Sequence, residues 1–105
     1  MADDLSLLHE RIRVLLASDA DGMGLPRAEI EPTLTEGYAR ALELDAESLR
    51  LEQRIERLTR EVAGGQEVRS GQFSALLRAM HEAEARSAEL RAVLESLRRL
   101  AAKAA

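Results

Sequence analysis

The sequence predicts an all-α fold: a long antiparallel helical hairpin, coiled-coil-like, with a short N-terminal helix packed at its open end. Apolar or small residues recur at alternating spacings of three and four from Leu34 to Val62, and again from Phe73 to Ala101. This is the heptad pattern of helices that pack along one seam. The glycine pair Gly64-Gly65 separates the two seams. Because so short a connection cannot carry the chain back to the far end, the two helices must run antiparallel if they pack together.

The composition favours exposed helix faces over a broad globular core. The chain has 105 residues, of which 46% are hydrophobic and 32% charged, and Tyr38 and Phe73 are its only aromatic rings apart from two histidines. A single helical domain over residues 1–105 is short of core unless a partner supplies more. The net charge of -4 works against the attraction to phosphates on which nucleic-acid binding depends.

We expect a cytoplasmic location. The chain has no cysteine, which excludes disulfides and thiolate metal sites and suits a reducing interior. The start Met1-Ala2-Asp3-Asp4 lacks the basic and then apolar pattern of a signal peptide, and no apolar run approaches membrane-spanning length. Lys103 is the only lysine, and such arginine- and alanine-rich usage favours a bacterial source.

The first helix is expected over about residues 4–17. Asp3 or Asp4 can accept the free amides that open a helix. The polar residues carry both signs of charge, so packing against the protein's own helices is favoured over a membrane surface. The apolar side of this helix consists of Leu5, Leu8, Ile12, Leu15 and Leu16.

A linker is expected over residues 18–32, where turn-forming residues gather. Asp19-Ala20-Asp21-Gly22 resembles part of a calcium-binding loop. The first and twelfth positions of that loop would be Ala17 and Ala28, where carboxylates are needed, so a linker is favoured over a calcium site.

The long helices are expected over about residues 33–63 and 72–102, with a loop at residues 64–71. Thr33-Leu34-Thr35-Glu36 has the spacing of a capping box, in which Thr33 would accept an amide hydrogen bond. Pro32 either interrupts an earlier turn or lies in the first turn, so the start between Pro26 and Thr33 is open. The glycine pair suits the left-handed geometry past a helix end.

Folding the chain about the middle of that loop aligns Val62 with Phe73, and Gly37 with Leu97. The same alignment places Ser48 opposite Ser87. The two serines either form a polar layer that fixes the alignment or bond to their own helix backbones.

The loop end of the hairpin is the candidate interaction surface. A first helix of about 13 residues, and so about 20 Å long, covers less than half of the hairpin. Near the open end, Tyr38 and Leu42 lie beside the seam and offer a surface for that helix. Two helices alone cannot shield a seam from water, so we expect the loop end to bind a second copy, as a homodimer or higher helical oligomer, or another protein. The predicted interface residues are Leu51, Ile55, Leu58, Val62, Phe73, Leu76, Leu77 and Met80.

No pattern predicts a catalytic residue, a cofactor or a metal site. A di-iron helix needs a glutamate three residues before its histidine, where this chain has Ser6 before His9 and Arg78 before His81. A zinc-hydrolase motif starting at His81 would need a second histidine at Ala85. We therefore interpret both histidines as surface or interface residues.

The first of two alternative functions is a small all-helical enzyme. The segment Asp4-Leu5-Ser6-Leu7-Leu8-His9-Glu10-Arg11-Ile12 resembles the first helix of the all-helical chorismate mutase family, which implies a small enzyme that clasps a dicarboxylate with arginines and a lysine. The resemblance covers under a tenth of the chain and the family's lysine does not follow, so no site is carried over.

A weak nucleic-acid-binding accessory protein is the other alternative. Arg50, Arg54 and Arg57 form a cluster, but glutamates interleave with them and no aromatic residue is available for stacking. We therefore expect a non-enzymatic protein-protein interaction module that serves in self-association, or as a scaffold or adaptor.

Overall fold

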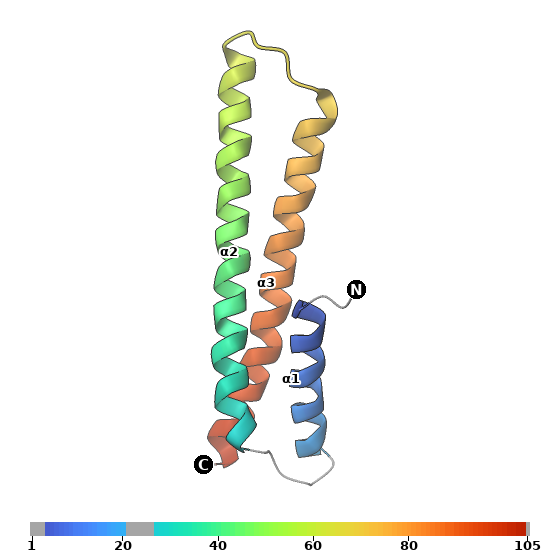
Figure 1. The fold of residues 1–105 in the computed structure, drawn as a ribbon, viewed down its shortest axis with the longest axis vertical. Helices are drawn as coiled ribbons and strands as arrows, with labels where there is room; N and C mark the ends of the chain where they lie inside the picture. Colours follow the sequence, from blue (N-terminus) through green and yellow to red (C-terminus); the bar gives the residue numbers. More distant parts are fainter. Residues whose placement is uncertain (1–3, 21–26, 105) are drawn as a thin grey trace. The chain divides into compact units, whose positions relative to one another are not determined.

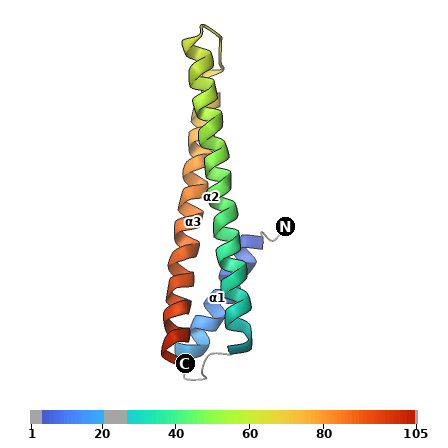
Figure 2. The same cartoon turned by 90° about the vertical axis from the view of Figure 1, so that its left-hand side faces the viewer.

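The computed structural model describes residues 4–20 and 27–104. These residues form three helices, α1 (Asp4–Ala20), α2 (Arg27–Ala63) and α3 (Ser70–Ala104). α2 and α3 pack together extensively and run in opposite directions, joined by a loop, as Figures 1 and 2 show from two sides. The predicted all-α helical hairpin with a short N-terminal helix is confirmed.

Contacts within the chain form two compact units. The three-helix unit comprises residues 1–41 and 88–105, and so contains α1, the first part of α2 and the last part of α3. The two-helix unit comprises residues 42–87, with the rest of α2, the loop and the first part of α3.

The three-helix unit has a buried apolar core to which all three helices contribute. Ile12 on α1 and Leu94 on α3 have no exposed surface, and Ile30 on α2 is 3% exposed. Because the buried residues come from all three helices, each helix shields the other two. α1 therefore packs on the hairpin of its own chain. The buried apolar residues of this unit are Leu5, Leu8, Ile12, Leu15, Ile30, Ala41, Leu90, Leu94 and Leu97.

α2 begins at Arg27, earlier than the predicted start at residue 33. The capping-box interpretation is wrong, because Thr33 lies inside the helix and its Oγ1 accepts a hydrogen bond from Arg11 Nη2 at 3.3 Å. The same Arg11 nitrogen donates to Glu36 Oε2 at 2.5 Å. Pro32 removes one backbone hydrogen bond from the helix. Burial of Ile30 and Thr33 in the three-helix unit explains why the helix nevertheless includes this turn.

The other helix boundaries also extend past the predicted ones. α1 continues to Ala20 rather than ending near residue 17, and α3 begins at Ser70 rather than near residue 72. The predicted cap Asp3, the Asp21-Gly22 part of the calcium-like loop and Pro26 lie outside the described residues.

The end of α2 is fixed by its glycine pair, as predicted. Gly65 has a φ of 90°, in the left-handed region that glycine adopts at little cost. Its N–H donates to the Val62 carbonyl at 3.0 Å, and the Gln66 N–H donates to the Glu61 carbonyl at 3.0 Å. These two bonds make a Schellman motif, which satisfies carbonyls that the end of a helix leaves unpaired.

The predicted alignment of α2 with α3 is off by about one helical turn. In the three-helix unit, a Cβ at Gly37 would lie 2.3 Å from Leu94 Cδ2, so Gly37 faces Leu94, three residues before the predicted Leu97. In the two-helix unit, Ser87 bonds to Asp45, three residues before the predicted Ser48. The loop at residues 64–69 is shorter than predicted, which moves the fold point toward α2 and accounts for the direction of the shift.

Candidate functional site

The eight predicted interface residues all lie in the two-helix unit, and we name them the apolar face. Within α2 they recur at spacings of four, three and four, so they line one side of the helix. Leu76 is 7% exposed, whereas Val62 and Leu77 are 47% and 40% exposed. The others are half-buried: Leu51, Ile55, Leu58, Phe73 and Met80.

The partial exposure follows from the number of helices. Two helices touch along one line and leave the side chains beside that line open to water. Full burial of a leucine or phenylalanine side chain stabilises a protein by about 1.5–3 kcal/mol relative to full exposure. A half-buried side chain gives only part of this stabilisation. The apolar face can therefore gain free energy by contact with another apolar surface.

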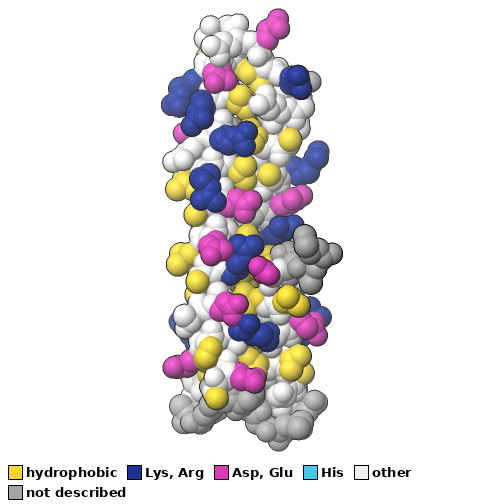
Figure 3. Space-filling model, in the orientation of Figure 1, with side chains coloured by type: hydrophobic (Ala, Val, Ile, Leu, Met, Phe, Trp, Pro, Cys, Tyr) yellow, Lys and Arg dark blue, Asp and Glu magenta, His cyan; other side chains and the backbone are white. Residues whose placement is uncertain are grey.

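Charged side chains flank the apolar face. In the upper part of Figure 3, yellow apolar side chains are visible between dark-blue arginines, with magenta carboxylates among them. Arg54, Arg57 and Glu61 line a hollow of about 200 Å³ together with Leu58 and Gln72. An apolar strip with a polar rim is the usual composition of a protein-protein contact.

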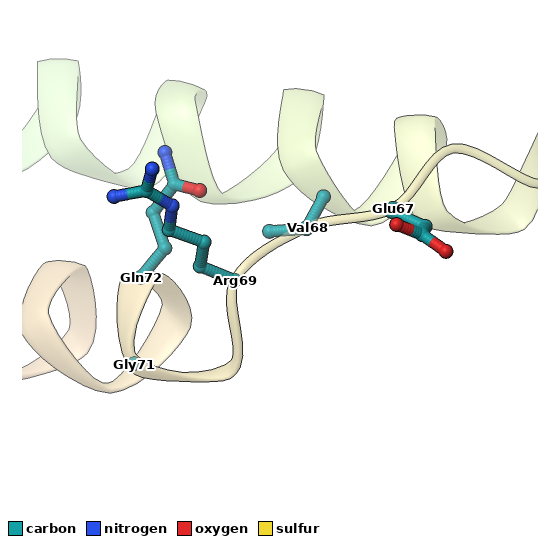
Figure 4. A pocket seen from close by; sticks show the side chains of 5 residues that line it. All are labelled: Glu67, Val68, Arg69, Gly71 and Gln72. Carbon is teal, nitrogen blue, oxygen red and sulfur yellow. The ribbon is translucent and has the colours of Figure 1, made fainter.

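A larger hollow of about 710 Å³ lies under the loop between α2 and α3 (Figure 4). In the close view, the side chains of Arg69 and Gln72 extend toward α2, and Glu67 points away from it. Of the lining residues only Val68 is half-buried, and the others are exposed. The hollow therefore offers no enclosed site for a small molecule.

Two serines form hydrogen bonds between α2 and α3 in the two-helix unit, each with a carboxylate of the other helix. Ser87, 4% exposed, donates from Oγ to Asp45 Oδ1 at 2.7 Å. Ser48 donates from Oγ to Glu84 Oε1 at 3.4 Å. The predicted pairing of Ser48 with Ser87 is wrong, because each serine bonds to a carboxylate of the other helix instead. The polar pairs still lie midway along the seam, where they can fix its alignment.

The two histidines belong to different helices and to different units. His9 is half-buried on α1 and His81 is exposed on α3. Within residues 4–20 and 27–104, no group of three or more His, Cys, Asp or Glu side chains is arranged to hold a metal ion.

Among the residues that the structure describes, four exposed leucine and valine side chains lie outside the apolar face. Leu42 and Leu49 on α2 are 64% and 53% exposed, and Leu7 and Val14 on α1 are 57% and 55% exposed. The prediction that α1 covers Leu42 is wrong. Sequence reasoning did not single out Leu7 and Val14, although their spacing of seven residues places them on one side of α1.

Comparisons of the chain with protein-family models, with curated proteins and with solved structures found no match. Across the described parts of α1, α2 and α3, no stretch is both long enough and apolar enough to span a membrane.

Proposed function

We propose that this protein is a non-enzymatic interaction module that self-associates through the apolar face, so that two hairpins form a four-helix, coiled-coil-like bundle. One observation carries the proposal. Seven of the eight face residues are half-buried or exposed in the single chain, whereas Leu90, Leu94 and Leu97, which continue the same heptad seam of α3 in the three-helix unit, have no exposed surface.

In the three-helix unit, α1 supplies the surface that completes the seam between α2 and α3. A second hairpin can supply the same kind of surface to the two-helix unit. A helix of another protein would serve equally in a scaffold or adaptor role.

The absence of cysteine supports a cytoplasmic setting, and the arginine-rich composition supports a bacterial source.

The variant Leu58→Asp tests the proposal. Leu58 is half-buried in the single chain, so the hairpin can tolerate the carboxylate, whereas a dimer would have to bury it at a cost of several kcal/mol. Leu42→Asp is the matched control, because it makes the same chemical change on α2 at a side chain that is 64% exposed.

Light scattering gives the mass of each variant, and far-UV circular dichroism confirms that each is helical. We expect wild type and Leu42→Asp to be dimers and Leu58→Asp to be a folded monomer. A folded wild-type monomer at micromolar concentration, or a Leu58→Asp variant that associates as wild type does, would contradict the proposal.

A small helical enzyme is the second candidate, because two arginines, Arg54 and Arg57, line one hollow. Its volume of about 200 Å³ is below the range of about 300–1,000 Å³ that is usual for ligand pockets, and Glu61 places a carboxylate beside the two arginines. Calorimetry with a small dicarboxylate distinguishes the two functions. Saturable binding that Arg54→Ala abolishes would favour the enzyme.

Nucleic-acid binding is addressed by a similar direct test. Retention of a labelled oligonucleotide that falls steeply with added salt would support it. The interaction module is expected to show no such retention.

A further inference from the structure

The two-helix unit carries an uneven distribution of charge along its length. Its loop half, residues 54–78, has five arginines and three glutamates, a net charge of +2. Its distal half, residues 42–53 and 79–87, has six carboxylates and two arginines, a net charge of -4. Most of these charges lie on exposed side chains of α2 and α3.

We propose that the apolar face binds a second copy of this chain in antiparallel orientation, with the loop half of each copy against the distal half of the other. This inference rests on the proposed self-association and adds the identity and the orientation of the partner. The charge pattern supports this orientation, because the loop half is net positive and the distal half is net negative, so two copies of the same surface can complement each other.

A twofold dimer uses the same surface on both copies, so each half must face either itself or the other half. In the parallel arrangement, each loop half (+2) faces the other loop half and each distal half (-4) faces the other distal half, so like charges repel along the whole length. In the antiparallel arrangement, each loop half faces a distal half, so opposite net charges attract at both ends. Exposed charges act over about 8–10 Å at physiological salt, a distance similar to the spacing of packed helices, so these charges can select the orientation.

The apolar face and the charge boundary agree on where the twofold axis would pass. The face runs along α2 from Leu51 to Val62, and the charge changes sign near Arg54. Both features place the axis close to Ile55. The loop then lies about ten residues, or about 15 Å, from the axis, so the two loops are about 30 Å apart.

A distance between the loops of two copies is the first test. The chain has no cysteine, so Gln66→Cys provides a single labelling site on an exposed loop residue. Pulsed electron paramagnetic resonance on the spin-labelled protein should give a separation of about 30 Å, and dilution with unlabelled chain should remove it. In a parallel dimer the loops would be adjacent, about 10–15 Å apart.

The outcomes separate the orientation from the association itself. A short distance in a protein of dimeric mass overturns the antiparallel orientation and leaves the proposed self-association intact. A monomeric mass overturns both.

Charge reversal in the distal half is the second test. Glu47→Arg with Glu52→Arg brings that half from -4 to zero, which removes attraction in an antiparallel dimer and repulsion in a parallel one. We expect the dissociation constant to rise by about 5–10-fold at low salt, with less effect as salt is added. A dissociation constant that is unchanged or lower overturns the proposal. Glu31→Arg with Glu89→Arg, two exposed positions in the three-helix unit, changes the net charge equally and should leave association unaltered.

Discussion

The two units of this protein share α2 and α3 but differ in whether a third helix covers the seam. In the three-helix unit, Leu90, Leu94 and Leu97 have no exposed surface. In the two-helix unit, Leu44 is also buried, at 1% exposed, but Leu51 and Leu58, which hold equivalent heptad positions, are half-buried. The same periodic pattern therefore gives two outcomes. Periodicity specifies that a side chain faces a neighbouring helix, but it does not specify how much of that side chain stays exposed to water.

Truncation of a leucine in each unit is the change with the largest expected effect. Leu94→Ala removes a fully buried side chain and should lower the free energy of unfolding by about 3–5 kcal/mol, because a cavity is added to the lost burial. This loss should not depend on protein concentration. Leu58→Ala should cost less than about 1.5 kcal/mol in the dilute single chain, since the side chain is half exposed there.

Chemical denaturation of both variants at several protein concentrations checks this difference. The cost of Leu58→Ala should grow with concentration as the apolar face becomes buried between copies. If both variants lost the same unfolding free energy in dilute solution, the two positions could not differ in burial as described.

Replacing glycine with alanine should change the stability of the fold by a smaller amount, and in opposite directions in the two units. A methyl group at Gly37 would lie 2.3 Å from Leu94 Cδ2, so Gly37→Ala should destabilise the fold by about 1–2 kcal/mol, although alanine favours helix. Nothing lies within 4 Å of a Cβ built at Gly71 in α3, so Gly71→Ala should stabilise it by about 0.5–1 kcal/mol. Thermal unfolding followed by circular dichroism measures both, and a stabilising Gly37→Ala would mean that the close approach to Leu94 is absent.

The hairpin and its turn were predictable because each depends on local pattern. Seven-residue periodicity gives the faces of the helices, and Gly65 marks the end of α2 by a backbone conformation that other residues adopt only at a cost. The early start of α2 was not predictable in the same way. It depends on burial of Ile30 and on the bond from Arg11 to Thr33, which joins residues far apart in the sequence.

The alignment of the helices was missed for a related reason. A heptad pattern matches itself again after each shift of three or four residues, so periodicity does not choose between such alignments. The length of the loop and the bond between Ser87 and Asp45 distinguish them, and neither is visible in the spacing of leucines. The same ambiguity explains why the exposure of Leu42 was not foreseen.

Hydrogen exchange at several protein concentrations tests most directly whether the two-helix unit is completed by a second copy. For amides of residues 51–62 that open locally, exchange should slow by about 100-fold when the concentration is 100 times the dissociation constant. Locally opening amides of α1, in the three-helix unit, should exchange at the same rate at every concentration. Exchange at residues 51–62 that does not change with concentration would contradict the account.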